Sequence, residues 1–129
     1  MDSKKTVRSL LFKYPEKNIV QIPPEDPTEI ICEVEPTSEH PDYSMAIAVI
    51  EKSEPHYHKL STETYTVLSG SLVLKLAHRD VVLRDVVLHP GMDHTIPPDT
   101  VHSAEADGAW VRVTSRPGWT SEDYILMGE

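Results

Sequence analysis

The sequence predicts a single all-β domain, either a sandwich or a barrel. Short runs rich in β-branched and aromatic residues recur at close spacing along the chain. Eleven prolines separate these runs, which suits many short strands better than long helices. No apolar pattern of helical period persists for three turns. With 129 residues, the chain is long enough for one domain with a buried core.

The N-terminal third is expected to contain an arm and three strands. Residues 1–17 are mixed and polar, and they predict a loosely held arm or an edge strand before a domain of residues 18–129. Two short strands are expected at 18–23 and 28–34, on either side of a proline-rich turn. Residues 43–51 predict a strand with apolar side chains on both faces, so both faces are expected to be covered.

The later strands follow from alternation and from turn residues. In the segment 71–76, Leu72, Leu74 and Leu76 share one face, which predicts that they point into the core. A tandem repeat, Arg-Asp-Val-Val-Leu, predicts two strand segments in 79–88. A further strand is expected at 109–115, and the tail 119–129 is expected to close the fold.

Four potential metal ligands come from separate parts of the chain. His56 and His58 are two positions apart, so on a strand both imidazoles lie on the same face. Glu63 opens the next strand-like run after a polar turn, and His102 follows the turn at Pro97 and Pro98. Two histidines, a carboxylate and a third histidine suit a divalent transition metal with an open coordination position.

Charge and cysteine content limit the partners and the compartment. The net charge of −9 makes a nucleic acid or an anionic membrane surface an unfavourable partner. Cys32 is the single cysteine, so no intrachain disulfide can form, and its strand-like surroundings predict a buried, inert thiol. This fits a reducing cytoplasm. The apolar run at 10–12 is too short for a signal peptide or a membrane span.

The candidate ligands lie within sequences that resemble the two signature motifs of the cupin superfamily. The first motif, with two histidines, a glutamate and a glycine, is matched by His56, His58, Glu63 and Gly70, with Ile50 in place of its leading glycine. The second is matched by Gly91, Pro97 and His102, with Asp99 in place of a glycine and Ala106 in place of an asparagine. The resemblance implies a single-domain jelly-roll barrel (a double-stranded β-helix), one divalent metal ion and a homodimer.

A narrower likeness concerns the carboxy-terminal cupin part of type II phosphomannose isomerases. It rests on short stretches: His-Tyr-His-Lys-Leu, Val-Leu-Ser-Gly, Val-His-Ser and Ser-Glu-Asp-Tyr-Ile. It implies a small metalloenzyme that acts on a small oxygenated anion, with sugar-phosphate isomerisation as the specific hypothesis. An Fe(II)-dependent dioxygenase and a non-catalytic barrel that senses or stores a small ligand are the alternatives. Imidazoles accept Zn, Fe, Ni or Cu and the carboxylate adds Mn, so the ligand set does not choose the metal.

Two further residues are candidates for catalysis. Tyr65 shares the strand parity of Glu63, so it either moves a proton near the metal or is an ordinary interior aromatic residue. Arg112 lies in the middle of a strand-like run, where it either faces solvent or lines a cavity. In a cavity, its guanidinium would hold a phosphate or carboxylate group with two hydrogen bonds.

Overall fold

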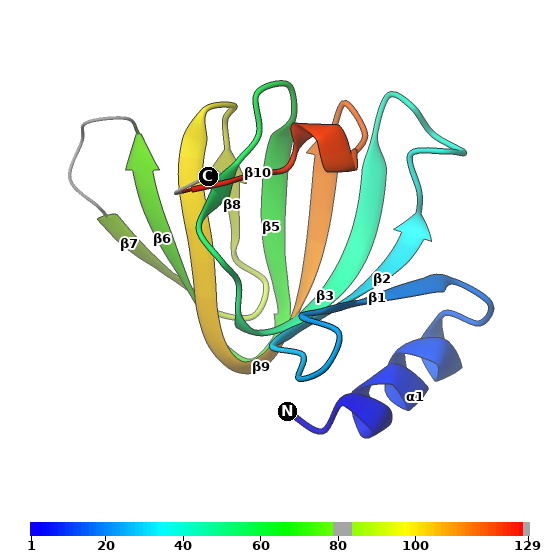
Figure 1. Ribbon diagram of the computed structural model, residues 1–129. Coiled ribbons are helices and arrows are strands. Elements are labelled where there is room, and N and C mark those ends of the chain that lie inside the picture. Colours follow the sequence, from blue (N-terminus) through cyan, green and yellow to red (C-terminus); the bar gives the residue numbers. More distant parts are fainter. Residues whose placement is uncertain (79–83, 128–129) are drawn as a thin grey trace.

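The computed structural model describes residues 1–78 and 84–127 and shows a β-barrel with one α-helix on its outer surface (Figure 1). The all-β prediction is therefore confirmed, whereas the strand segment expected at 79–83 lies outside the described residues. The elements are α1 (Ser3–Lys13), β1 (Asn18–Ile22), β2 (Glu29–Glu35), β3 (Ser44–Lys52), β4 (His56–Tyr57), β5 (Thr62–Ser69), β6 (Leu72–His78), β7 (Arg84–Leu88), β8 (Asp93–Ile96), β9 (Thr100–Arg116), the short 3-10 helix η1 (Ser121–Asp123) and β10 (Ile125–Leu126).

β9 connects the parts of the barrel. Its first half pairs with β4 and β6, and its second half pairs with β3 and β5. The sequence suggested a strand only from residue 109, but β9 runs unbroken through 17 residues. The change of direction occurs inside the strand, where the register with β3 shifts after Ile50 and Gly108 takes a φ of +71°. Such an irregularity bends a strand without ending it, and this bend lets β9 curve around the barrel.

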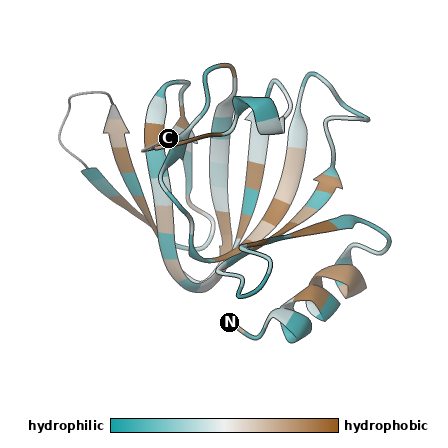
Figure 2. Ribbon diagram, in the orientation of Figure 1, coloured by the Kyte–Doolittle hydropathy of each residue, from teal (hydrophilic) through white to brown (hydrophobic). Residues whose placement is uncertain are grey.

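Two apolar clusters lie on opposite faces of the sheet that contains β2 and β3. Hydrophobic residues occur both in the strands of the barrel and in α1 (Figure 2). The inner cluster fills the barrel and includes Leu72, Leu74 and Leu76, as the alternation predicted. The outer cluster includes Cys32 and Ile47, and it is covered by α1. Apolar residues on both faces of β3 are thus buried in two different cores, which confirms the prediction of a strand covered on both sides.

The first 17 residues are not a loose arm or an edge strand, because Ser3–Lys13 form the helix α1. Asp2 caps this helix by accepting a hydrogen bond from the backbone N–H of Lys5 at 3.1 Å. Val7, Leu10 and Tyr14 follow one another at helical spacing and pack against the outer cluster. The stripe is short and Phe12 beside it is 88% exposed, so the sequence pattern alone gave little indication of a helix.

Replacing Leu10 with Ala should lower the free energy of unfolding by about 1–2 kcal/mol. Leu10 is fully buried under α1, but the helix can undock without opening the barrel, which limits the loss. The matched control is Phe12→Ala on the exposed side of the same helix, which should change stability by less than about 0.5 kcal/mol. Urea denaturation measures both variants, and an equal loss in the two would contradict the described packing.

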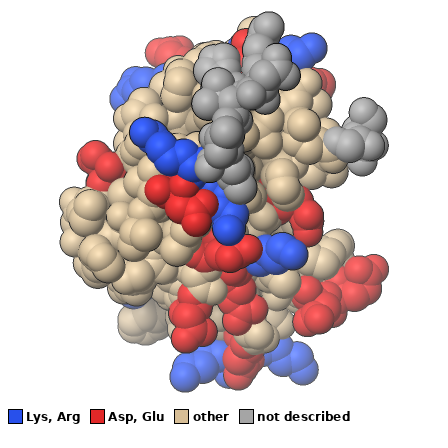
Figure 3. Space-filling model, turned by 90° about the vertical axis from the view of Figure 1, so that its left-hand side faces the viewer, with Lys and Arg blue, Asp and Glu red and all other residues tan. Residues whose placement is uncertain are grey.

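The described helices include none that is long and apolar enough to cross a membrane. On the face shown in Figure 3, Lys and Arg side chains are interspersed with Asp and Glu, and the described residues there form no continuous basic stripe. This distribution agrees with the acidic net charge of the chain.

Candidate metal centre

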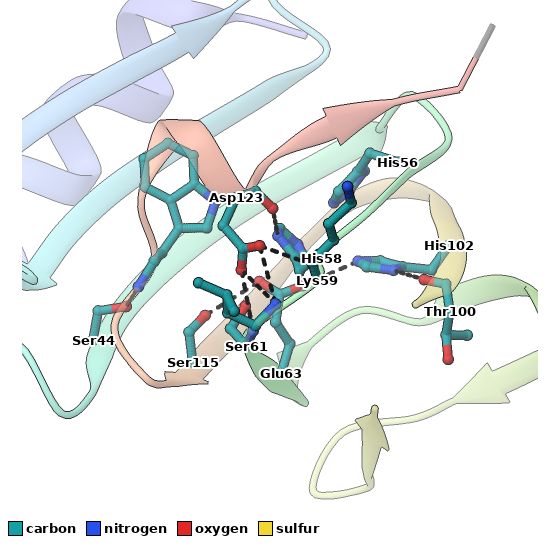
Figure 4. A network of polar contacts seen from close by, with 12 residues as sticks. Ser44, His56, His58, Lys59, Ser61, Glu63, Thr100, His102, Ser115 and Asp123 are labelled. Atoms are coloured by element: carbon teal, nitrogen blue, oxygen red, sulfur yellow. Dashed lines mark hydrogen bonds and ion pairs between the residues drawn. The ribbon is translucent and has the colours of Figure 1, made fainter. Parts of the chain in front are cut away.

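Four side chains from three strands and one loop meet inside the barrel (Figure 4). They are His56 in β4, His58 just after it, Glu63 in β5 and His102 in β9. One potential ligand atom from each lies within 4.8 Å of the others. The four residues are only 5%, 3%, 4% and 1% exposed. The structure therefore brings together the four residues that the sequence motifs selected.

The three imidazoles are oriented in the same way by the backbone. Nδ1 of His56 lies 2.8 Å from the carbonyl oxygen of Glu54, and Nδ1 of His102 lies 2.9 Å from that of Thr100. Nδ1 of His58 lies 2.8 Å from the carbonyl oxygen of Asp123. Because a carbonyl only accepts hydrogen bonds, each Nδ1 carries the proton and donates it. In the neutral ring, Nε2 then has a free lone pair, as metal-binding histidines require.

Glu63 lies between two of these rings. Its Oε1 is 3.0 Å from Nε2 of both His58 and His102, and its Oε2 accepts a hydrogen bond of 3.3 Å from the hydroxyl of Ser115. The contact with His58 is close enough for an ion pair, but it lacks the alignment of a hydrogen bond. Nε2 of His58 is therefore buried without a hydrogen-bond partner among the described residues. An unpartnered buried nitrogen is costly. A cation shared with Glu63 would satisfy it, so these residues fit a metal ion.

The protonation states of His56 and Glu63 also suit metal binding. Burial, together with the nearby His102, lowers the pKa of His56 to about 4. Burial tends to raise the pKa of Glu63, but its contacts with His102 and His58 outweigh this and lower that pKa below the usual range. At neutral pH His56 is therefore neutral and Glu63 is ionised, and these are the forms that bind a metal. For His58, burial lowers the pKa but the contacts with Glu63 outweigh it and raise that pKa, so a metal ion would have to displace a proton there.

The C-terminal tail supports this cluster through Asp123, which the sequence analysis did not select. Its carboxylate accepts hydrogen bonds from the backbone N–H groups of Lys59 at 2.8 Å and of Leu60 and Ser61 at 3.1 Å. Its backbone carbonyl orients His58. These N–H groups hold the pKa of Asp123 below its usual range, although burial alone would raise it. The contacts span more than 60 positions, and no local spacing pattern reveals them.

Two tyrosines lie against the histidines. The ring of Tyr124 stacks on His56 with centroids 4.4 Å apart, and Tyr65 meets His102 edge to face at 6.0 Å. Burial, followed by the charge of Glu63, raises the pKa of Tyr65 well above its ordinary value. The hydroxyl of Tyr65 therefore stays protonated at neutral pH. It can donate a hydrogen bond, but it is a poor base.

Arg112 does not reach the interior of the barrel. It is exposed on β9, between the inward-facing Val111 and Val113. Its neighbours in register are Ile47 and Thr66, and Ile47 belongs to the outer cluster. Because alternate residues of a strand face opposite sides, Arg112 lies on the outer face. The hypothesis that it holds an anion inside the cavity is wrong.

A cavity of about 480 Å³ opens beside the four-residue cluster, and both His56 and Glu63 line it. Most of its wall is apolar, and β1, β2 and β3 supply nearly half of the lining residues. Tyr65, Trp119 and Tyr124 add aromatic rings to it. Its charged lining residues are Glu29, Glu33, Glu35 and Glu63, and no Lys or Arg lines it in the described part of the chain. The cavity is therefore acidic and largely apolar.

Glu29 is a second cavity residue that the sequence analysis missed. Burial, followed by the negative charge of Glu63, raises its pKa to about 7. Glu29, Ile31, Glu33 and Glu35 alternate along β2, and all four line the cavity. A polar face on a strand ordinarily indicates solvent, so the sequence gave no sign that this face lines a cavity.

The raised pKa of Glu29 predicts that the metal-free protein loses stability as the pH rises from 5 to 8. The unfolded carboxyl ionises near 4.5 and the folded one near 7, so the folded state binds more protons in this interval. The loss attributable to Glu29 should be roughly 1–2 kcal/mol, because solvent contact reduces the effect. Urea unfolding at pH 5 and at pH 8 should show this loss of stability in the wild type and not in Glu29→Gln. The same pH dependence in both proteins would contradict the assignment.

Comparison with known proteins supports the fold. A family model described as "Cupin domain" matches residues 43–114. Among solved structures, Streptomyces Pac13 with uridine is 16% identical with a TM-score of 0.72, covering 88% of this chain and 87% of that one. KdgF from Halomonas sp. is 20% identical with a TM-score of 0.63, covering 79% and 89%. No curated protein sequence matches this chain.

Bacillus subtilis oxalate decarboxylase is also similar, at 15% identity with a TM-score of 0.75, and the match covers 88% of this chain but only 31% of that enzyme. At such identities these likenesses concern the fold alone. The family model spans more than half of the sequence and the barrel agrees with it. This chain therefore belongs to the cupin domain family.

Proposed function

We propose that this protein is a metal-dependent enzyme that acts on a small oxygen-containing molecule held in the barrel cavity. The observation that supports this most strongly is the common orientation of the three histidines. In each, a backbone carbonyl fixes Nδ1, and the four potential ligand atoms converge at the wall of the cavity. A cluster in a cavity suits catalysis better than a purely structural metal site, which is normally closed to ligands.

A divalent ion held by His56, His58, Glu63 and His102 would act as a Lewis acid toward an oxygen atom of the substrate. The side chains around the cluster have separate tasks. Tyr65, with its raised pKa, donates a hydrogen bond to the substrate. The apolar walls exclude water, which strengthens polar contacts inside the cavity. Pac13, which is described as a nucleoside dehydratase, and oxalate decarboxylase offer catalytic precedents for the fold.

The lining of the cavity bears on the hypothesis of a sugar-phosphate isomerase. Phosphate groups are usually bound by Arg or Lys side chains or by helix N-termini. The described lining offers carboxylates instead, and Arg112 lies outside. We therefore favour an unphosphorylated substrate, and we retain aldose–ketose conversion only as one result of the test below.

The test is a metal analysis followed by a substrate screen. Protein purified without added ions should contain about one divalent ion per chain, and it should convert at least one small oxygen-containing molecule. Iron with O₂ uptake would identify the dioxygenase, and manganese or zinc with aldose–ketose turnover would identify the isomerase. Tight ligand binding without turnover would support the sensor and contradict an enzyme. The His102→Ala variant, which lacks one proposed ligand, should show neither metal nor turnover.

Two other expectations stay predictions. The homodimer that the family resemblance implies can be tested by light scattering coupled to gel filtration. The cytoplasmic location suggested by the single cysteine can be tested by fractionation of cells that express the chain.

A further inference from the structure

Glu29 stands apart from the other carboxylates of the cavity wall. Glu33 accepts a hydrogen bond of 2.9 Å from Asn18, and Glu35 accepts one of 2.6 Å from Tyr43. No described residue donates a hydrogen bond to the side chain of Glu29 or forms an ion pair with it, although it lines the same cavity. Glu29 is half-buried, so its carboxylate keeps some solvent contact but loses part of its hydration on this largely apolar wall. The missing partner can come from a ligand.

The surroundings of Glu29 show which kind of ligand would be its partner. It lies at the start of β2, opposite Ile22 of β1 and Ile50 of β3. Glu29, Tyr65 and Tyr124 line the same cavity. The charge of Glu29 adds to burial in raising the pKa values of both tyrosines, and for Tyr65 it follows the charge of Glu63 as well. The titratable groups that line the cavity with it are carboxylates, these tyrosines and His56, which is neutral.

A positively charged ligand would relieve several unfavourable contacts at once. It would pair with the Glu29 carboxylate and reduce the repulsion between Glu29 and Glu63, which adds to the larger effect of burial in raising the pKa of Glu29. Trp119 and Tyr124 line the same cavity with ring centroids 6.2 Å apart, and aromatic faces attract cations. An anionic ligand would instead approach the carboxylates of Glu29, Glu33 and Glu35, which no Lys or Arg of the described lining offsets.

We propose that Glu29 determines the specificity of the cavity by binding a ligand that bears a positively charged amino group. Glu29 pairs with the ammonium group while an oxygen atom of the same ligand faces the four-residue cluster. The second contact rests on the proposed function, whereas the pairing with Glu29 does not. The substrate class is therefore a small amine that also has an oxygen donor.

Three hydroxamates with the same metal-binding head test this proposal on the zinc-loaded protein at pH 7.5. They are β-alanine hydroxamate, with an ammonium tail, propionohydroxamate, with a neutral tail, and the monohydroxamate of succinate, with a carboxylate tail. Calorimetry should show the ammonium compound binding about 10-fold more tightly than the neutral one, and the carboxylate compound binding most weakly. Glu29→Gln should abolish the advantage of the ammonium compound without changing the affinity for the neutral one.

The matched control is Glu33→Gln, which alters the same wall and strand at a carboxylate that already has a partner. It should keep the wild-type order of affinities. Equal affinities for the three hydroxamates in the wild type, or an unchanged order in Glu29→Gln, would overturn the proposal. Both substitutions preserve size and remove a charge, so we expect the variants to fold.

A second measurement separates this inference from the proposed function. Zinc content is determined first, and a protein that takes up no zinc would contradict the proposed function. The metal-free protein is then heated with cyclohexylammonium or with cyclohexanecarboxylate at equal concentration. The ammonium ion should raise the Tm of the wild type more than that of Glu29→Gln, and the carboxylate should not. Equal shifts in both proteins would refute the role of Glu29, whatever the zinc content.

Discussion

The His58→Ala variant should bind zinc or manganese roughly 100-fold or more weakly than the wild type and should still fold. Removal of a residue that only orients a metal ligand typically costs about 10–100-fold in affinity, so the loss of a direct ligand should cost at least as much. The apolar residues that fill the barrel do not include His58, so the fold should survive. Metal content after dialysis, measured by mass spectrometry, gives the affinity, and circular dichroism reports the fold.

His89→Ala is the matched control for this experiment. His89 is exposed after β7, and its ring contacts the hydroxyl of Ser71 at 3.0 Å, away from the four-residue cluster. The His89→Ala variant should therefore bind as much metal as the wild type. If His58→Ala retained full metal content, or if both variants lost metal equally, the assignment of His58 as a ligand would be wrong.

Asp123→Ala should lower the free energy of unfolding by about 2–4 kcal/mol, because three backbone N–H groups lose their shared acceptor. Water can accept the hydrogen bond from the backbone N–H of the exposed Leu60 in the variant, so the loss should be smaller than that of three buried hydrogen bonds. The same change should weaken metal binding by about 10-fold, because the backbone of Asp123 orients His58. Urea denaturation and metal titration measure the two effects.

Two further substitutions test whether the carboxylate of Asp123 causes these losses. Asp123→Asn keeps one side-chain oxygen as an acceptor and should lose less stability than Asp123→Ala. Glu122→Ala removes the neighbouring exposed acid in η1 and should change neither property. Wild-type metal affinity in Asp123→Ala, together with unchanged stability, would show that the tail does not hold this loop in place.

The parts of the structure that depend on local alternation could be predicted from the sequence. Leu72, Leu74 and Leu76 point inward because side chains on a strand alternate. The spacing of the histidines, the glutamate and the turn residues around them matches two cupin motifs, and this match selected His56, His58, Glu63 and His102. Neither alternation nor motif spacing shows whether a given face of a strand points into the barrel or away from it. Arg112 faces outward and Glu29 faces the cavity, and only the curvature of the whole barrel decides this.

The helix α1 and Asp123 were missed for other physical reasons. A helix of 11 residues gains most of its stability from packing. The short apolar stripe of Val7, Leu10 and Tyr14 stabilises α1 only through contact with the outer face of β2 and β3. Asp123 acts on backbone N–H groups, which every residue type except proline offers. These hydrogen bonds require no particular side chain at the partner positions Lys59, Leu60 and Ser61, so the sequence there does not reveal them.

Three imidazoles and one carboxylate are expected to bind a single metal ion. An anomalous difference map from crystals grown with zinc tests it most directly. The account predicts one strong peak about 2.0–2.2 Å from Nε2 of His56, His58 and His102 and from a carboxylate oxygen of Glu63. A map with no peak there, or with its strongest peak at other side chains, would contradict the account.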